Sequence, residues 1–94
     1  MNKEEIIFRV HYDIRPDRDK YFGKCINLDG VYVEGDTKKE TRLLLREAIK
    51  VHLQTLVINN LPIPKEIISV ESFQSEVPMY SHHKTTEAME VAVV

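Results

Sequence analysis

One long segment with the spacing of an amphipathic helix most constrains what this chain can fold into. Its apolar residues recur every three or four positions, the repeat that places side chains on one face of a helix. The residues of this repeat, with Leu44 and Val51 at its margins, are Leu45, Ala48, Ile49, His52, Leu53 and Leu56. The pattern predicts a helix from about Lys38 to Asn59, roughly 33 Å long.

Both ends of this segment carry signals that bound a helix. Thr37 and Glu40 have the spacing of a capping box, in which two side chains satisfy backbone N–H groups of the first turn. Asp36 beside them suits the positive end of a helix. Pro62 and Pro64 prevent the helix from continuing. The segment is therefore one bounded helix, whose apolar face must pack against another part of the chain.

Three segments before the helix have the pattern of strands. Residues 6–15 alternate between apolar and polar side chains. Residues 20–26 follow a turn at residues 15–20 too soon for a crossover helix, so the two strands must pair antiparallel. After another turn, residues 31–34 supply a short third strand, which completes a predicted antiparallel meander. The apolar face of the first strand holds Ile6, Phe8, Val10, Tyr12 and Ile14.

The chain after the helix is less regular until its last residues. Residues 67–73 can be extended, whereas residues 74–86 show no periodicity, and we expect them to be mobile or to reach across to a second subunit. Residues 87–94 predict a final strand. Because proteins normally cover an apolar edge strand, we expect this strand to form a homodimer or a higher homo-oligomer. Its candidate dimer residues are Met89, Val91 and Val93.

The pattern as a whole predicts an α+β fold of order β-β-β-α-β in a single domain over residues 1–94. A content of 43% apolar and 30% charged residues is typical of a globular chain. No apolar run approaches the ~20 residues that span a membrane, and the charged N-terminus lacks the apolar stretch of a signal peptide, so we expect a cytoplasmic protein. The single cysteine, Cys25, excludes an internal disulfide.

Charge is unevenly distributed along the chain, although the net charge is only −2. Residues 1–36 carry six basic and eight acidic side chains, and residues 66–94 carry one basic and five acidic ones. Residues 37–65, which contain the helix, carry six basic and two acidic side chains. A basic middle can meet phosphate, and acidic flanks can meet a basic protein.

Catalytic and metal-binding interpretations find little support. Four carboxylates near strand ends could suggest a two-metal nuclease, but their positions are those of turn and helix-start residues. They are Asp13, Asp29, Glu34 and Asp36. The four histidines, His11, His52 and the pair His82-His83, lack the spacing of a metal site, and His52 is expected to be a packed helix residue. Cys25 is expected to be a small buried hydrophobe. We therefore expect no enzyme, no metal and no cofactor.

One surface feature suggests binding. Lys38, Arg42, Arg46 and Lys50 recur every four residues on a slowly drifting face of the helix. Such a stripe is a candidate contact face for phosphate or RNA. An ordinary solvated face is the alternative, because Glu40 and Glu47 lie near the stripe and no aromatic residues interleave with it.

The stretch from Tyr21 to Pro64 resembles the HicB antitoxin family. It contains an aromatic second strand, a turn ending in glycine, a short strand ending in Gly-Asp-Thr, a helix and a closing Pro-x-Pro. Six of these residues have structural roles in the motif: Gly30, Gly35, Asp36, Thr37, Pro62 and Pro64. The matching residues are Tyr21-Phe22, Asn27-Leu28-Asp29-Gly30, Glu34-Gly35-Asp36-Thr37, Glu40, Arg46-Glu47-Ala48-Ile49, His52-Leu53 and Leu61-Pro62-Ile63-Pro64.

The resemblance implies a partial RNase H-like fold without catalytic carboxylates. It also implies binding to a small basic mRNA-cleaving toxin, HicA, and assembly into homo-oligomers. Many members carry a C-terminal DNA-binding module, but this sequence stops at Val94, so we expect a stand-alone domain with no direct DNA binding. Thr41 stands where the family usually has Ala, and Val31 stands where Cys commonly follows the turn glycine.

Two functional hypotheses follow from the sequence. The first is a protein-binding antitoxin domain that occludes a basic toxin, with the acidic flanks speeding the encounter. The second is a stand-alone RNA-binding or regulatory domain that uses the basic helix face.

Overall fold

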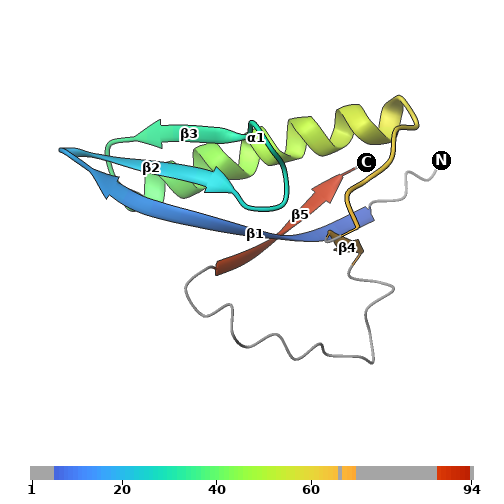
Figure 1. The fold of residues 1–94 in the computed structure, drawn as a ribbon, viewed down its shortest axis with the longest axis horizontal. Coiled ribbons are helices and arrows are strands. Elements are labelled where there is room, and N and C mark those ends of the chain that lie inside the picture. The colour runs from blue at the N-terminus through green and yellow to red at the C-terminus, as the bar shows by residue number, and fades with distance from the viewer. Residues whose placement is uncertain (1–5, 66, 70–86, 94) are drawn as a thin grey trace.

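The computed structural model describes residues 6–65, 67–69 and 87–93, which form one helix and five strands (Figure 1). The predicted α+β class, with a three-stranded meander, a helix and a C-terminal strand, is confirmed. A two-residue strand is added within the segment 67–73, and residues 74–86 lie outside the described part of the chain. The elements are β1 (Ile6–Asp17), β2 (Lys20–Cys25), β3 (Tyr32–Gly35), α1 (Lys38–Ile58), β4 (Ile68–Ser69) and β5 (Glu87–Val93).

β1 is the central strand of the antiparallel sheet. Tyr12 lies opposite both Cys25 of β2 and Glu87 of β5, so these two strands flank β1 on opposite sides. Phe8 lies opposite both β4 and β5, which places β4 on the β2 side, nearer the start of β1. β3 pairs with β2. Within the described residues, the outer strands of the sheet are therefore β3 and the two-residue β4 on one side of β1, and β5 on the other.

The first hairpin is tighter than the turn predicted over residues 15–20. β1 continues to Asp17, and only Arg18 and Asp19 form the turn, with Arg18 at a φ of 63°. Pro16 is tolerated inside the strand because its backbone nitrogen points away from β2. The carbonyl of His11 accepts a hydrogen bond from the N–H of Ile26 on the β2 side, so the nitrogen of Pro16, five residues later, faces away from β2.

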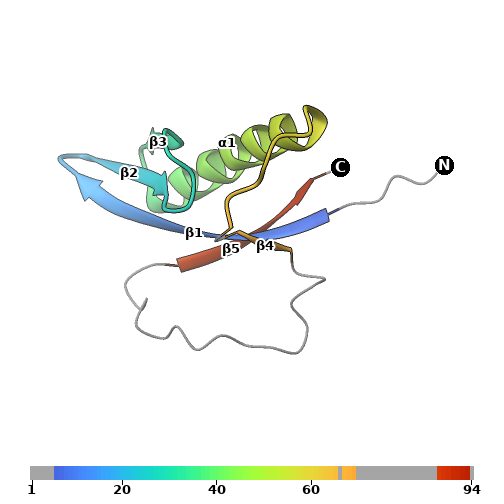
Figure 2. The same ribbon diagram turned by 45° about the vertical axis from the view of Figure 1, so that its right-hand side comes forward.

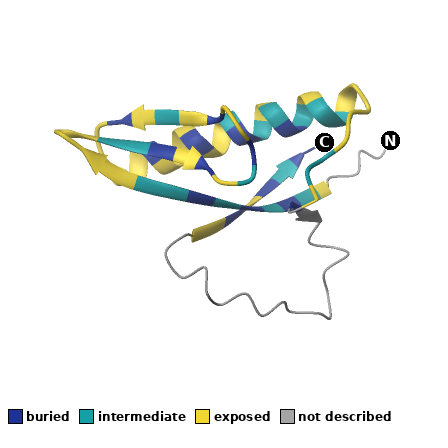
Figure 3. Cartoon of the chain, viewed as in Figure 1, coloured by how far each residue is buried: buried dark blue, intermediate teal, exposed yellow. Residues whose placement is uncertain are grey.

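α1 lies across one face of the sheet and closes the core between them (Figures 1 and 2). The side chains of Leu45, Ile49 and Leu53 are fully buried against β1 and β5. Of the residues predicted to face inward on β1, Phe8, Val10 and Tyr12 are buried, whereas Ile6 near the start of the strand is exposed. Figure 3 marks the buried residues along the helix and the strands in dark blue. Two margin residues of the helical repeat were wrongly placed by the pattern, because Leu44 and Val51 are 42% and 59% exposed. They lie too far around the helix to reach the sheet.

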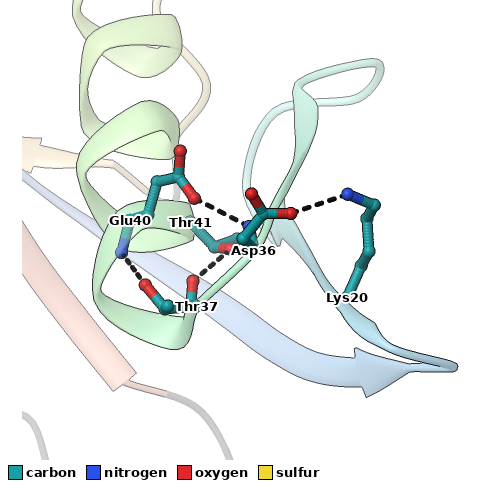
Figure 4. Close-up of polar contacts among 5 residues, drawn as sticks. All are labelled: Lys20, Asp36, Thr37, Glu40 and Thr41. Atoms are coloured by element: carbon teal, nitrogen blue, oxygen red, sulfur yellow. Dashed lines mark hydrogen bonds and ion pairs between the residues drawn. The ribbon is translucent and has the colours of Figure 1, made fainter.

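The start of α1 is held by a compact set of polar contacts (Figure 4). The Thr37 hydroxyl accepts a hydrogen bond from the N–H of Glu40 at 3.0 Å, which confirms the predicted cap. The Glu40 carboxylate accepts one from the N–H of Asp36 at 2.7 Å, one residue before the usual partner in a capping box. The carboxylate of Asp36 accepts one from the Nζ of Lys20 at 2.6 Å, so this contact also ties β2 to the helix start.

Gly35 allows the chain to pass closely beneath this first turn. A Cβ atom at Gly35 would lie 2.6 Å from Oγ1 of Thr41 and 3.1 Å from its backbone nitrogen. Thr41 cannot easily turn away, since its side chain is fully buried and its hydroxyl donates to the carbonyl of Thr37 at 2.7 Å. Only glycine fits the approach of β3 to α1 without a shift of the backbone.

Replacing Gly35 with alanine should therefore lower the free energy of unfolding by about 1–3 kcal/mol, the usual cost of overpacking. The cost should be smaller in a Thr41→Ala background, because that change removes the nearest atom and leaves the nitrogen at 3.1 Å. Urea unfolding of the two single variants and the double variant measures the coupling. Equal costs of Gly35→Ala in the two backgrounds would show that the close approach does not limit this position.

Candidate functional site

Two surface hollows lie on opposite sides of α1. The arginine hollow, of about 680 Å³, lies beside β5 and is lined by Arg9, Tyr12, Arg42, Arg46, Ala88, Met89 and Glu90. The apolar groove, of about 590 Å³, lies beside β3 and is lined by Gly30, Val31, Tyr32, Glu47, Ala48, Val51, His52, Thr55 and Leu56. The two hollows differ in chemistry, because guanidinium groups dominate the first and apolar side chains the second.

Ion pairs and hydrogen bonds to Glu90 organise the arginine hollow. Nη2 of Arg9 lies 3.0 Å from Oε2 of Glu90, and Nη1 of Arg46 donates to the backbone carbonyl of Glu90 at 2.7 Å. These contacts join β1 and α1 across β5. At about half exposure, the ion pair contributes little to stability. Together with the Arg46 hydrogen bond, it orients two guanidinium groups toward Glu90.

Only part of the predicted basic stripe meets in this hollow. Arg42 and Arg46 line it, whereas Lys38 and Lys50 do not. Each step of four residues turns the helix ~40° beyond a full circle, so the two ends of the stripe point in directions ~120° apart. Arg9 completes the cluster. The sequence pattern does not indicate this, because the place of Arg9 depends on the pairing of β1 with β5, a strand far along the chain.

The phenol of Tyr12 lies at the inner side of the arginine hollow. Its O–H donates to Oε1 of Glu87 at 2.6 Å. Burial, with help from the hydrogen bond to Glu87 and its negative charge, raises the pKa of Tyr12 to about 12, while Arg42 and Arg46 oppose this shift. The neutral phenol is therefore strongly preferred in the folded protein.

The predicted dimer strand has its apolar side chains inside this chain. Met89, Val91 and Val93 are buried against α1 and β1. By the alternation of the ladder, the backbone groups of Ala88, Glu90 and Ala92 face the open edge, where Arg46 already binds the Glu90 carbonyl. A homodimer through β5 stays a prediction, and it would use backbone groups rather than the three apolar side chains.

The apolar groove is shallow, and two exposed side chains border it. Tyr32 is 62% and Val51 is 59% exposed, although both are large and apolar. The floor includes Ala48 and Leu56, which pack against the core. Sequence reasoning missed this groove, because it placed Val51 in the core and Tyr32 simply in a strand. An apolar helix margin next to an exposed aromatic residue on a short strand is the signal that could have indicated it.

The candidate catalytic carboxylates remain dispersed. Asp13 pairs with Arg15 at 2.6 Å and Asp36 pairs with Lys20, while Asp29 lies exposed in a turn. Over the described residues, no three His, Cys, Asp or Glu side chains lie together in a way that could hold a metal ion.

The cysteine and the histidines also have local explanations where they are described. Cys25 is buried as predicted, and burial raises the pKa of its thiol. The backbone N–H of His11 donates to Oδ1 of Asn27 at 2.8 Å, and His52 is half-buried at the groove. His82-His83 lies outside the described residues.

Among the described segments, no helix is long and apolar enough to cross a membrane.

The Tyr12–Glu87 contact predicts a distinct pH dependence. Because the pKa of Tyr12 is raised above the ordinary tyrosine value of 10.0, its contribution to stability should be complete below pH 10 and be lost as the pH rises toward 12. An absorbance titration of tyrosinate should show a component near pH 12 that is absent from Tyr12→Phe. In Glu87→Gln this component should titrate at a lower pH, and an unchanged midpoint would contradict the role of Glu87.

Comparison with known proteins agrees with the fold. In a search of solved structures, the chain is similar to a chain of a "HicA3 and HicB3 toxin-antitoxin complex", with a TM-score of 0.50, 17% identity, and coverage of 94% of this chain and 98% of that one. At this identity the likeness shows a shared fold. No curated protein matches the chain. The UPF0150-like family model matches residues 4–64, which run from β1 to the prolines after α1, and the protein therefore belongs to the UPF0150-like family.

Proposed function

We propose that this protein is a cytoplasmic, non-enzymatic antitoxin-type domain that binds a small basic mRNA-cleaving toxin and neutralises it by covering its active surface. The observation that carries the proposal is the shared fold with a chain of a toxin-antitoxin complex, which extends over nearly the whole of both chains. The UPF0150-like family match and the HicB-type motifs between Tyr21 and Pro64 agree with it.

The chemistry of the described residues favours binding over catalysis. The paired carboxylates of Asp13 and Asp36 form surface ion pairs, and Asp36 also lies at the start of the helix. The described part of the chain contains no cluster suited to metal chemistry. The two flanks of the chain carry an excess of acidic side chains, which attracts a basic partner and raises the rate of encounter. Steric occlusion needs only a stable complementary surface and no reactive group.

A direct test is co-expression with a small basic ribonuclease encoded beside this protein. Expression of the toxin alone should arrest growth, and co-expression of this domain should relieve the arrest, because a bound toxin cannot reach mRNA. The purified domain should also reduce RNA cleavage in proportion to the complex formed. A Leu45→Asp variant, which places a charge in the core, supplies a matched unfolded control. A toxin that stays fully active beside excess folded domain would contradict the proposal.

The arginine hollow supports a second candidate, an RNA-binding or regulatory domain. Arg9, Arg42 and Arg46 gather from β1 and α1 at one place, as a phosphate contact requires. Their contacts with Glu90 compete with phosphate, and no aromatic side chain there other than Tyr12 could stack on a base. This candidate is therefore second to the antitoxin role.

If the arginine hollow binds RNA, affinity should fall steeply with salt, because phosphate contacts release counterions. The double variant Arg42→Glu/Arg46→Glu should abolish binding of a single-stranded RNA in an electrophoretic mobility assay. The control Lys24→Glu/Lys65→Glu makes the same change of net charge at exposed sites outside the hollow and should retain binding. An absence of RNA binding by the wild-type domain at low salt would exclude this function.

A further inference from the structure

The β3 and β5 edges of the described sheet lie beside surfaces of different charge. The β5 edge faces the arginine hollow, with Arg9, Arg42 and Arg46 around it. The β3 edge lies beside the apolar groove, which has Glu47 as the only charged residue of its lining within the described part of the chain. An extended segment of another protein can add to an open edge as a further strand, and its charge decides which edge it joins.

The backbone of β3 is free to pair at two residues. The N–H of Cys25 donates to the carbonyl of Val31 at 3.0 Å, so Val31 faces β2. Because alternate residues of a strand direct their backbone groups to opposite sides, Tyr32 and Glu34 present theirs to the open edge. An incoming strand could therefore form backbone hydrogen bonds with both residues. At β5, in contrast, Arg46 already binds the outward carbonyl of Glu90.

The apolar groove offers a place for the side chains of such a strand. Side chains of a strand added to β3 would alternate between the helix side and the outer side of the sheet. Those on the helix side would meet the groove, where Val51 is 59% exposed and Ala48 and Leu56 form the floor. Those on the outer side would lie beside Tyr32, which is 62% exposed and contacts the ring of Phe22, and beside Glu34. Covering these side chains removes apolar surface from water, which favours binding.

Acidic side chains lie on both faces of the sheet at this edge. Glu47 lines the groove on the helix side, and Glu34 is exposed on the outer face of β3. Glu40 is exposed seven residues before Glu47, two helical turns along the same side of α1. A second copy of this chain would bring these carboxylates against each other, whereas a basic segment would pair with them.

We infer that the open edge of β3 and the apolar groove form the docking site for an extended segment of a basic partner protein, with apolar side chains in the groove and basic ones on the outer face beside Glu34, while Glu47 at the groove adds to the attraction. The identification of that partner as the toxin rests on the proposed function, but the site and its chemistry do not. Docking there leaves the arginine hollow uncovered.

The site can be tested on the full chain with a short fluorescent peptide of alternating Lys and Val. Fluorescence anisotropy should show binding of this peptide and not of a counterpart with alternating Glu and Val. Amide hydrogen exchange should slow at Tyr32 and Glu34 when the peptide is bound, and should be unchanged at Ala88 and Ala92. A failure of the basic peptide to bind, or protection at β5 instead, would overturn the inference.

Two pairs of variants give the test matched controls. Val51→Asp should weaken peptide binding by about tenfold, the loss expected for a central interface residue, and the control Leu43→Asp makes the same change at an exposed helix position outside the groove. Glu47→Lys should weaken binding by a similar factor. Its control, Asp19→Lys, makes the same charge change in the exposed turn between β1 and β2. Equal affinities within each pair would overturn the inference.

The same variants separate this inference from the proposed function. If the domain neutralises a toxin, Val51→Asp neutralises it as well as Leu43→Asp does, and the basic peptide does not bind at β3, the antitoxin role holds and the docking site is wrong. If the basic peptide binds at β3 but no toxin is neutralised, the docking site holds and the antitoxin role is wrong.

Discussion

The pairing of β1 with three other strands is the constraint on which the rest of the structure depends. β1 pairs with β2, β4 and β5, and its apolar face, with Val10 fully buried, supplies the sheet side of the core. β5 comes from the far end of the chain. Its pairing with β1 completes the sheet and brings Glu90 to Arg9 and Arg46. A shift of the β1–β5 register by one residue would turn Met89 away from the core. It would also separate the residues that line the arginine hollow.

The position of α1 gives the protein two different surfaces. The helix buries a narrow row of residues. One of its flanks lies beside β5 and the other beside β3. One flank presents arginines next to β5, and the other presents Val51 and Glu47 next to β3. A near-neutral chain thereby offers a basic face and an acidic, partly apolar face, and each of these suits a different class of partner.

Local patterns predicted most of the fold because the signals are local in origin. The capping residue Thr37, the inward positions Leu45 and Ile49, and the alternation of β1 each depend on neighbours within a few residues. Helical spacing could not decide how wide the buried stripe is, which depends on how far the sheet extends beneath the helix. For this reason Val51 was assigned to the core, although it borders a groove.

The sequence by itself determined the order of strands and helix, the ends of the helix and the glycine at position 35, because backbone sterics, capping and side-chain periodicity act over short distances. Only the tertiary structure decided which charged residues meet. Arg9, Arg46 and Glu90 come together through the pairing of strands that are about eighty positions apart, and no periodicity in the chain encodes that distance. The two candidate surfaces are therefore properties of the assembled sheet and helix, since long-range pairing is what places their side chains side by side.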